Sequence, residues 1–285
     1  MGRVRVVTDS TADLAPDVAR DLDITVVPIR VRIGQEEFLE GVNLTEDAFI
    51  ARLRAQPRLL PSTVAPDADE FESVYAALAR TTDSILSVHL STRLGATCRM
   101  ATEAKERYTI RDVCRVVVID SQMTSLGLGL VAMETARAAQ AGRSLEEVAR
   151  LARAMLPQTH ILFFVDTLDY LQHGGRTGKI ETILNSVINI KPLLRLEEGE
   201  IVLMEKVRTR AKALERLYEF VADFPRVEAL GIVHSTSLNE ANNLAKRLES
   251  IVPRARVTIR RYGPGVAAHL GLGALGVVVY EGLER

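Results

Sequence analysis

One histidine near the end of the chain stands in a glycine-rich stretch and is the residue whose surroundings most suggest chemistry. His269 lies between Gly263 and Gly273, just before an apolar run at 277–280. Glycines allow the backbone to approach another segment or a ligand closely, and the imidazole is titratable near neutral pH. The pattern is therefore typical of a shaped binding site. It is equally typical of a tight connection before a final strand, with His269 hydrogen-bonded in the interior.

The same stretch contains a nucleotide-like motif that fails on its context. Residues 271–276 match G-x-G-x-x-G letter for letter. The dinucleotide fingerprint must follow a strand and open a helix, whereas this copy precedes an apolar run. We reject it. The five histidines show no metal-type H-x-x-x-H pairing, and no G-x-S-x-G elbow is present. A hydrolytic pair such as Ser91 with His269 stays open, because triad members need not be close in sequence.

Composition limits the protein class. The 285 residues are 47% hydrophobic and 26% charged, which is ordinary for a globular protein with room for two domains. A net charge of -1 gives no global electrostatic reason to bind nucleic acid or a membrane surface. The two cysteines suit a reducing cytoplasm, and no uncharged apolar run approaches the roughly 18 residues of a membrane span. We expect a cytoplasmic protein without stable membrane insertion.

Short apolar runs that end on small polar residues predict the strands. Near-continuous apolar strands are typical of a parallel sheet covered on both faces, and ligands gather at the carboxyl ends of such strands. Polar residues at those ends are candidate site residues, although for most of them a turn or helix-cap role is favoured. The runs are Val4–Val7, Ile85–Leu90, Val116–Ile119, Ile161–Val165 and Leu230–Val233.

Helices are predicted between these runs. Apolar residues recur at helical spacing there, and Ser144 with Glu147 and Ser237 with Glu240 have capping-box spacing at two expected helix starts. Strands that alternate with such helices predict α/β architecture.

Two stretches break the alternation and shape the expected domains. The segment around 30–43 reads as an edge strand with a small hairpin, and residues 193–204 read as an antiparallel hairpin around a glycine-containing acidic turn. We predict an N-terminal α/β domain with a parallel sheet over 1–156 and a C-terminal α+β domain with a mixed sheet over 157–285.

Several segments together carry a family resemblance. They are Val7–Leu14, Ser62–Pro66, Leu90–Thr97, Ile119–Ser121, Ser125–Gly129, Leu171–Arg176 and the stretch with His269. Each is weak alone, but in this order, over essentially the whole chain, they resemble the DegV family. That family includes the fatty-acid-binding subunit of bacterial fatty acid kinase.

The resemblance implies a site. By position, Thr63, Ser91, Thr92 and His269 would hold a fatty acid carboxylate, and Arg176 would lie at the head-group rim or contact the kinase. The acyl chain would occupy a buried apolar tunnel. The chain departs from the family pattern at residues 64–65 and 95–99, which affects local loop geometry and chain-length preference.

The resemblance also implies a function. The protein would bind a long-chain fatty acid and present its carboxylate to a separate ATP-dependent kinase that makes an acyl phosphate. It would be a carrier without catalytic activity, cofactor or metal, with at most transient membrane contact. Burying a roughly 16-carbon tail offers on the order of 10 kcal/mol gross, so hydroxyl donors need only orient the carboxylate, and His269 would add a charge-assisted bond if protonated. A Ser/His hydrolase or transferase, and a module for a small polar or phosphorylated ligand, are the alternatives.

Overall fold

The chain folds into two compact units, each made of two separate segments of the sequence. The computed structural model describes residues 3–107, 114–177, 179–180 and 190–283. One unit comprises Met1–Arg30 with Val64–Pro157, and the other comprises Val31–Thr63 with Gln158–Arg285. The expected contiguous first domain over 1–156 therefore needs a correction, because residues 31–63 belong to the second unit.

Ion pairs and hydrogen bonds tie that inserted segment to its unit. Arg260 contacts Glu46 at 3.3 Å, and Arg261 contacts Asp47 at 2.5 Å. These are contacts between residues more than 200 positions apart, and no local pattern announces them.

The first unit is built on a parallel sheet, as expected. Its strand order is β2-β1-β6-β7, and all three neighbouring pairs are parallel. The strands are β1 (Arg5–Asp9), β2 (Ile24–Val27), β6 (Ser84–His89) and β7 (Arg115–Asp120). Burial explains the near-continuous apolar runs, because four of the five β1 residues, Val6 to Asp9, are no more than 2% exposed.

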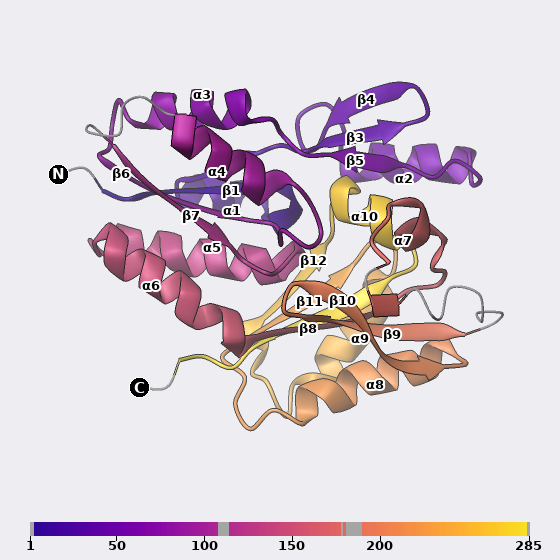
Figure 1. The fold of residues 1–285 in the computed structure, drawn as a ribbon. Helices are drawn as coiled ribbons and strands as arrows, with labels where there is room; N and C mark the ends of the chain where they lie inside the picture. Colours follow the sequence, from indigo (N-terminus) through magenta and orange to yellow (C-terminus); the bar gives the residue numbers. More distant parts are fainter. Residues whose placement is uncertain (1–2, 108–113, 178, 181–189, 284–285) are drawn as a thin grey trace. The chain divides into compact units, whose positions relative to one another are not determined.

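Helices cover both faces of this sheet (Figure 1). The pair α3 and α4 packs together on one face, and α5 and α6 pack together on the other. The predicted capping box at Ser144 is present at the start of α6. The helices are α1 (Pro16–Asp21), α3 (Ala68–Leu78), α4 (Thr97–Arg107), α5 (Ser125–Gln140) and α6 (Leu145–Met155), with 3-10 turns at Ser10–Ala12 and Leu156–Gln158.

The inserted segment forms a small sheet of its own. Strand β2 ends at Val27, directly before Pro28, and a new strand begins at Arg30. The predicted hairpin is confirmed, with Gly34 at a φ of 63° in its turn. The sheet has the order β4-β3-β5, with β3 (Arg30–Ile33), β4 (Glu36–Leu39) and β5 (Ser62–Val64), and α2 (Glu46–Ala55) lies between β4 and β5 in sequence.

The second unit contains a six-stranded mixed sheet, which confirms the predicted sheet type. Its order is β10-β9-β8-β13-β11-β12; β11 and β12 are parallel, and the other pairs are antiparallel. The predicted hairpin turns at Glu198 and Gly199, both with positive φ, as a two-residue hairpin favours. The strands are β8 (Thr159–Phe164), β9 (Lys191–Glu197), β10 (Glu200–Val207), β11 (Ala229–His234), β12 (Val257–Arg261) and β13 (Leu275–Tyr280).

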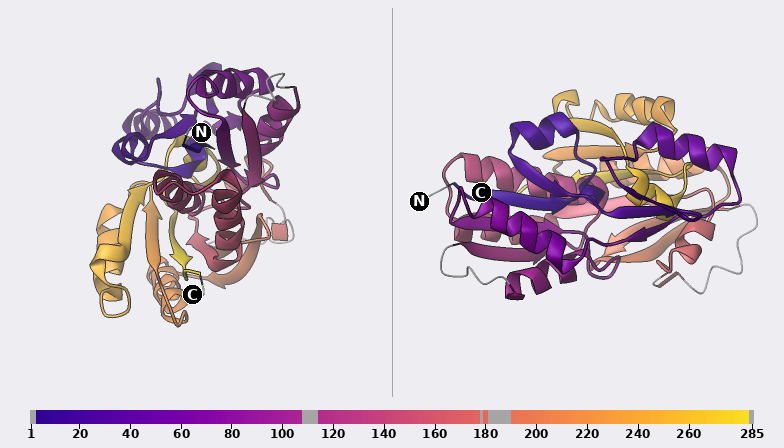
Figure 2. Two further views of the ribbon diagram at one scale, coloured as in Figure 1. Left: turned by 90° about the vertical axis from the view of Figure 1, so that its left-hand side faces the viewer. Right: turned by 90° about the horizontal axis from the view of Figure 1, so that it is seen from above.

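Helices α8 and α9 pack on one face of this sheet around a common apolar core (Figure 2). The helices of this part are α7 (Asp169–His173), α8 (Arg210–Ala222), α9 (Leu238–Leu248) and α10 (Pro264–Leu270), with a 3-10 turn at Arg254–Arg256. The expected capping box at Ser237 is wrong. Ser237 makes no side-chain cap, because Arg210 draws both Ser237 and Glu240 to itself.

Candidate functional site

Within the second unit, two of the predicted site residues touch. Thr63 lies on β5 and His269 on α10, and Thr63 Oγ1 is 2.8 Å from His269 Nε2. Both residues are partly buried. The inserted segment and the glycine-rich stretch, 206 positions apart, therefore form one hydrogen-bonded pair.

The other side of the His269 ring faces α7. A Cβ atom built on Gly174 would lie 2.2 Å from His269 Nδ1, so no side chain fits at this position. Nδ1 is buried and has no hydrogen-bond partner among the residues that the structure describes. A buried polar atom without a partner costs free energy, and such atoms call for a ligand or a function as explanation.

The imidazole of His269 is neutral at physiological pH. Burial is the main cause that lowers its pKa to about 3, and the neighbouring Arg176 and His173 act in the same direction. In the ligand-free protein at pH 7, His269 therefore lacks the proton that a charge-assisted bond would need. The ring acts as a neutral hydrogen-bonding group.

The loop after His269 is held by two donors. The Tyr262 hydroxyl donates to the carbonyl of Gly271 at 2.8 Å, and the Arg210 guanidinium donates to the carbonyl of Gly273 at 2.7 Å. A Cβ atom on Gly273 would lie 1.7 Å from the Asp166 carboxylate, which explains this glycine by close packing. The glycine pattern that resembled a nucleotide motif thus serves packing between α10 and β13.

Arg176 lies just after α7, close enough to His269 to lower its pKa. Its guanidinium donates to the carbonyl of Gly174, and burial lowers its pKa. Gly175 has a φ of 66°, the left-handed conformation that favours glycine, and so turns the chain at this point. Gly-Gly-Arg is therefore a unit in which Gly174 admits the His269 ring and Arg176 places a positive charge nearby.

Ser91 and Thr92 lie in the first unit, at the end of β6. Ser91 is fully buried; its amide donates to the Met123 carbonyl at 3.0 Å, and its hydroxyl accepts from the Arg93 amide at 3.2 Å. The Thr92 hydroxyl donates to Asp120 at 2.5 Å. Thr92 can offer that proton to a ligand only by leaving Asp120. Much of this strand edge thus shows the turn and cap roles expected of polar strand ends.

A fully buried row of polar side chains in the same unit resembles a hydrolytic triad in its contacts. His89 Nδ1 is 3.0 Å from Asp9, His89 Nε2 is 2.6 Å from the Ser87 hydroxyl, and the Tyr75 hydroxyl lies 2.8 Å from Ser87. All four side chains are 0% exposed. A nucleophile must reach its substrate, so this row is a part of the core.

The geometry of His269 also weighs against the hydrolase alternative. A catalytic base at neutral pH needs a pKa near that pH and a third group that orients its second nitrogen. The pKa of His269 is about 3, and no described residue pairs with its Nδ1.

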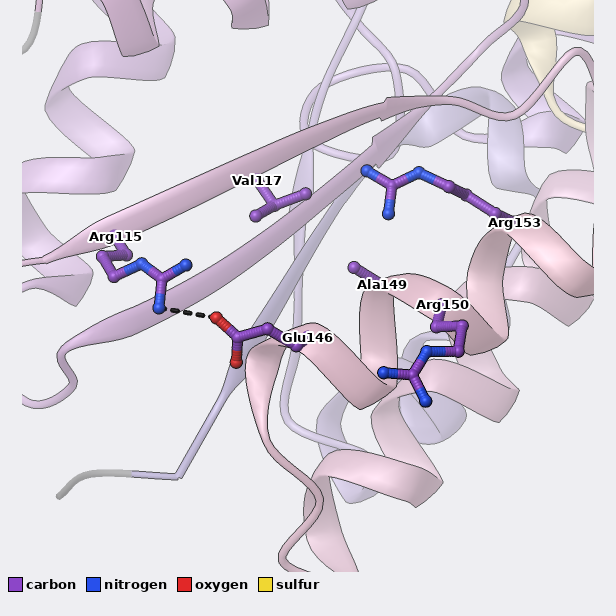
Figure 3. A pocket seen from close by; sticks show the side chains of 6 residues that line it. All are labelled: Arg115, Val117, Glu146, Ala149, Arg150 and Arg153. Carbon is purple, nitrogen blue, oxygen red and sulfur yellow. Dashed lines mark ion pairs between the residues drawn. The ribbon is translucent and has the colours of Figure 1, made fainter.

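A separate hollow of about 270 Å³ lies in the first unit, between β7 and α6 (Figure 3). Four of its six lining side chains are charged, and Arg115 and Glu146 form an ion pair at 2.6 Å. Only Val117 and Ala149 are apolar, so the hollow does not suit an acyl chain. None of the sequence-predicted site residues lines it.

Three further observations concern the described part of the chain. No group of three or more His, Cys, Asp and Glu residues there could hold a metal ion. Its helices include none that combines the length and apolarity needed to cross a membrane. Both cysteines are buried, and burial raises the pKa of Cys98 to about 12, so this thiol is unreactive.

Comparison with known proteins places this geometry in a family. The model of the DegV family, described as a family of uncharacterised proteins, matches residues 3–282. The chain belongs to the DegV family. A DegV domain-containing protein of Streptomyces coelicolor is 36% identical over 280 residues, which is 97% of this chain and 98% of the relative.

Two solved DegV structures share the fold closely. A DegV family protein from Thermus thermophilus, described by its fatty acid binding, superposes with a TM-score of 0.89 at 28% identity, over 98% of this chain and 99% of the other. DegV of Bacillus subtilis, described as a fatty acid binding protein, gives the same TM-score and identity over 98% and 100%. The DegV resemblance and the two-part α/β fold expected from the sequence are confirmed.

Sequence reasoning missed two residues that build the Thr63–His269 pair. Gly174 lies in the family segment Leu171–Arg176, but its packing against the His269 ring has no local signal. Glu40 was not singled out, although its carboxylate accepts a hydrogen bond from the Gly265 amide of α10 at 2.7 Å. Both contacts join segments that are distant in sequence.

Proposed function

We propose that this DegV protein binds a long-chain fatty acid and presents its carboxylate to a separate ATP-dependent fatty acid kinase. The Thr63–His269 pair would take part in holding the carboxylate, with Ser91 and Thr92 as further polar contacts and Arg176 at the head-group rim or the kinase surface. The tail would lie in a buried apolar tunnel. The fatty acid binding of DegV proteins with the same fold supports this proposal.

The observation that carries the proposal is the partly buried Thr63–His269 hydrogen bond, in which one of the two available protons is not used. A threonine hydroxyl and a neutral imidazole bring two protons, and their mutual bond uses one. With the proton on Nε2, His269 donates to Thr63 Oγ1, and the Thr63 hydroxyl proton remains for a carboxylate oxygen. The other nitrogen faces Gly174, which favours Thr63 as the direct contact and His269 as its support.

Neutral donors are sufficient because the tail supplies most of the binding free energy. Each buried methylene contributes about 0.8 kcal/mol, so a roughly 16-carbon chain offers on the order of 10 kcal/mol before association costs. A hydrogen bond to the charged carboxylate adds about 1.5–3 kcal/mol. The head group thus fixes the orientation of the ligand more than its affinity.

A carrier role fits the chemistry of the pair. A neutral His269 with a pKa of about 3 neither attracts a proton from a nucleophile nor neutralises the carboxylate. The carboxylate would keep its charge and its nucleophilic oxygen for phosphoryl transfer elsewhere. The kinase would supply the ATP site and the positive charges that phosphoryl transfer requires.

The decisive experiment is to extract the purified protein with organic solvent and identify the lipids by mass spectrometry, followed by titration with oleate and palmitate. We expect co-purified fatty acid and uptake of the added ligand. A protein with no bound lipid and no uptake would contradict the proposal. Added fatty acid kinase and ATP should convert the bound acid to acyl phosphate, which hydroxylamine traps as the hydroxamate.

The hydrolase alternative has its own test on the same preparation. Turnover of a p-nitrophenyl ester that disappears in Ser91→Ala would favour a Ser/His enzyme. Absence of turnover together with retained fatty acid would leave the carrier as the function.

A further inference from the structure

Helix α10, which carries His269, has no side-chain cap from its own N-cap residue. Helix α10 begins at Pro264, which has no amide proton, and its N-cap is Gly263, which has no side chain to cap the helix. The first available helical donor is the amide of Gly265. Helix termini leave such amides without an internal partner, and a buried amide needs one.

Glu40 supplies that partner from far along the chain. Its carboxylate oxygen accepts from the Gly265 amide at 2.7 Å, across 225 positions, and the residue is only 5% exposed. A carboxylate at a helix N-terminus is also favoured by the helix dipole. Glu40 follows β4, and a short turn after it, closed by the Gly41 amide and the Leu44 carbonyl at 3.1 Å, fixes its place.

We propose that Glu40 is a positioning residue for the carboxylate site, because it fixes the helix on which His269 meets Thr63. The inserted segment 31–63 then holds α10 at two points, with Glu40 at its first turn and Thr63 at its last. Both bonds come from one segment, so a shift of α10 relative to that segment would change the Thr63–His269 distance. An effect of Glu40 on fatty acid release rests on the proposed function, whereas its effect on the position of His269 does not.

Helix α10 is short enough for a change at its N-terminus to reach His269. Helix α10 has 7 residues, and His269 stands four positions after Gly265, about one helical turn. So short a helix has little stability of its own. Loss of the cap would let its first turn unwind, and His269 would gain solvent and lose its close contact with Gly174.

The test compares Glu40→Ala with Glu40→Gln and with Glu36→Ala. Gln keeps an acceptor oxygen of the same shape, whereas Ala removes it. Glu36 is the matched control, because it is an exposed glutamate on β4 that pairs with Arg52 at 2.6 Å. The first readout is the pKa of His269 in the ligand-free protein, followed by NMR of the ring carbons and assigned with His269→Gln.

In Glu40→Ala we expect the His269 pKa to rise by about one unit, since solvation favours the charged form. Glu40→Gln should move it much less, and Glu36→Ala not at all. The second readout is the dissociation rate of a fluorescent fatty acid, which should rise roughly fivefold in Glu40→Ala, the size of a lost cap. Thermal melting confirms that each variant is folded.

An unchanged His269 pKa in folded Glu40→Ala, or an equal change in Glu36→Ala, would overturn the proposal. If Glu40→Ala does not fold, Glu40→Gln decides: a His269 pKa shift larger than that of Glu36→Ala supports the proposal, and a shift no larger than that of Glu36→Ala overturns it. A protein that binds no fatty acid would remove the proposed function and leave the pKa test intact.

Discussion

Two histidine–hydroxyl pairs of this protein differ in how completely their hydrogen bonds are matched. In the first unit, His89 donates from Nδ1 to Asp9 and accepts at Nε2 from Ser87, whose oxygen accepts from Tyr75. In the second unit, His269 contacts Thr63 through Nε2, and its Nδ1 has no partner in the described chain. The residue types are alike, but only the first pair is complete, in the sense that both ring nitrogens of its histidine have a described partner.

The difference separates a core from a candidate site. In the complete row, each hydroxyl or ring proton is donated to the next side chain, from Tyr75 through Ser87 and His89 to Asp9, so none remains for a ligand. The Asp9 carboxylate also accepts from the backbone amides of Thr11 and Leu90. It therefore fixes the loops after β1 and β6. The incomplete pair keeps one proton for a partner that is not among the described residues. The hydrogen-bond partners, rather than the residue type, distinguish the structural histidine from the candidate binding histidine here.

The largest effect should come from breaking the complete row. Asp9→Ala removes the acceptor of four hydrogen bonds, from the Thr11 amide and hydroxyl, the Leu90 amide and His89. We expect a loss of about 3 kcal/mol in the free energy of unfolding, because buried donors would lose a charged partner. Urea denaturation measures it. A matched change at the exposed Asp17 should cost less than about 0.5 kcal/mol, and equal losses would mean that the row has no special structural role.

A second effect concerns acid stability and should come from the incomplete pair. The pKa of His269 is about 3 in the fold against 6.5 for the free side chain, so the unfolded chain binds the proton first as pH falls. The contribution of His269 to stability is therefore constant above about pH 7 and decreases as pH falls from 6.5 towards 3. Between pH 8 and pH 5 the loss is about 2 kcal/mol.

The measurement is the free energy of unfolding as a function of pH for the wild type and for His269→Gln. The variant should lack this part of the acid loss and show a shallower slope by about one proton. Buried His234, whose pKa burial also lowers, contributes equally to both curves. Identical slopes would show that His269 titrates normally.

The sequence predicted what local patterns control and missed what distant contacts decide. Apolar runs such as Ile161–Val165 predicted the strands, because burial on both faces of a sheet favours apolar residues along the whole strand. The capping box at Ser144 formed, whereas the one at Ser237 did not, because Arg210, 27 positions away, took its members. Residues 31–63 joined the second unit through ion pairs that no local spacing encodes.

The site followed the same rule. Only the resemblance to the DegV family predicted that Thr63 and His269 belong to one site. The local sequence around each residue does not relate two positions that are 206 residues apart. The resemblance left the charge of His269 undecided, because a pKa depends on burial and on neighbours such as Arg176. Gly174 and Glu40 support the pair through single contacts across the fold, and a composition or periodicity argument does not detect these.

The smallest effect should come from removing the Thr63 hydroxyl of the incomplete pair, and it concerns the affinity for the ligand. Thr63→Val keeps the shape of the side chain and removes the hydroxyl that we assign to the carboxylate. We expect oleate affinity to fall about tenfold, equivalent to about 1.4 kcal/mol, because the tail keeps its burial while one hydrogen bond to a charged group is lost. The matched variant Thr92→Val loses a hydroxyl that donates to Asp120, and its affinity should change less. A larger loss in Thr92→Val than in Thr63→Val would place the carboxylate nearer the end of β6, and the incomplete pair would then need another partner.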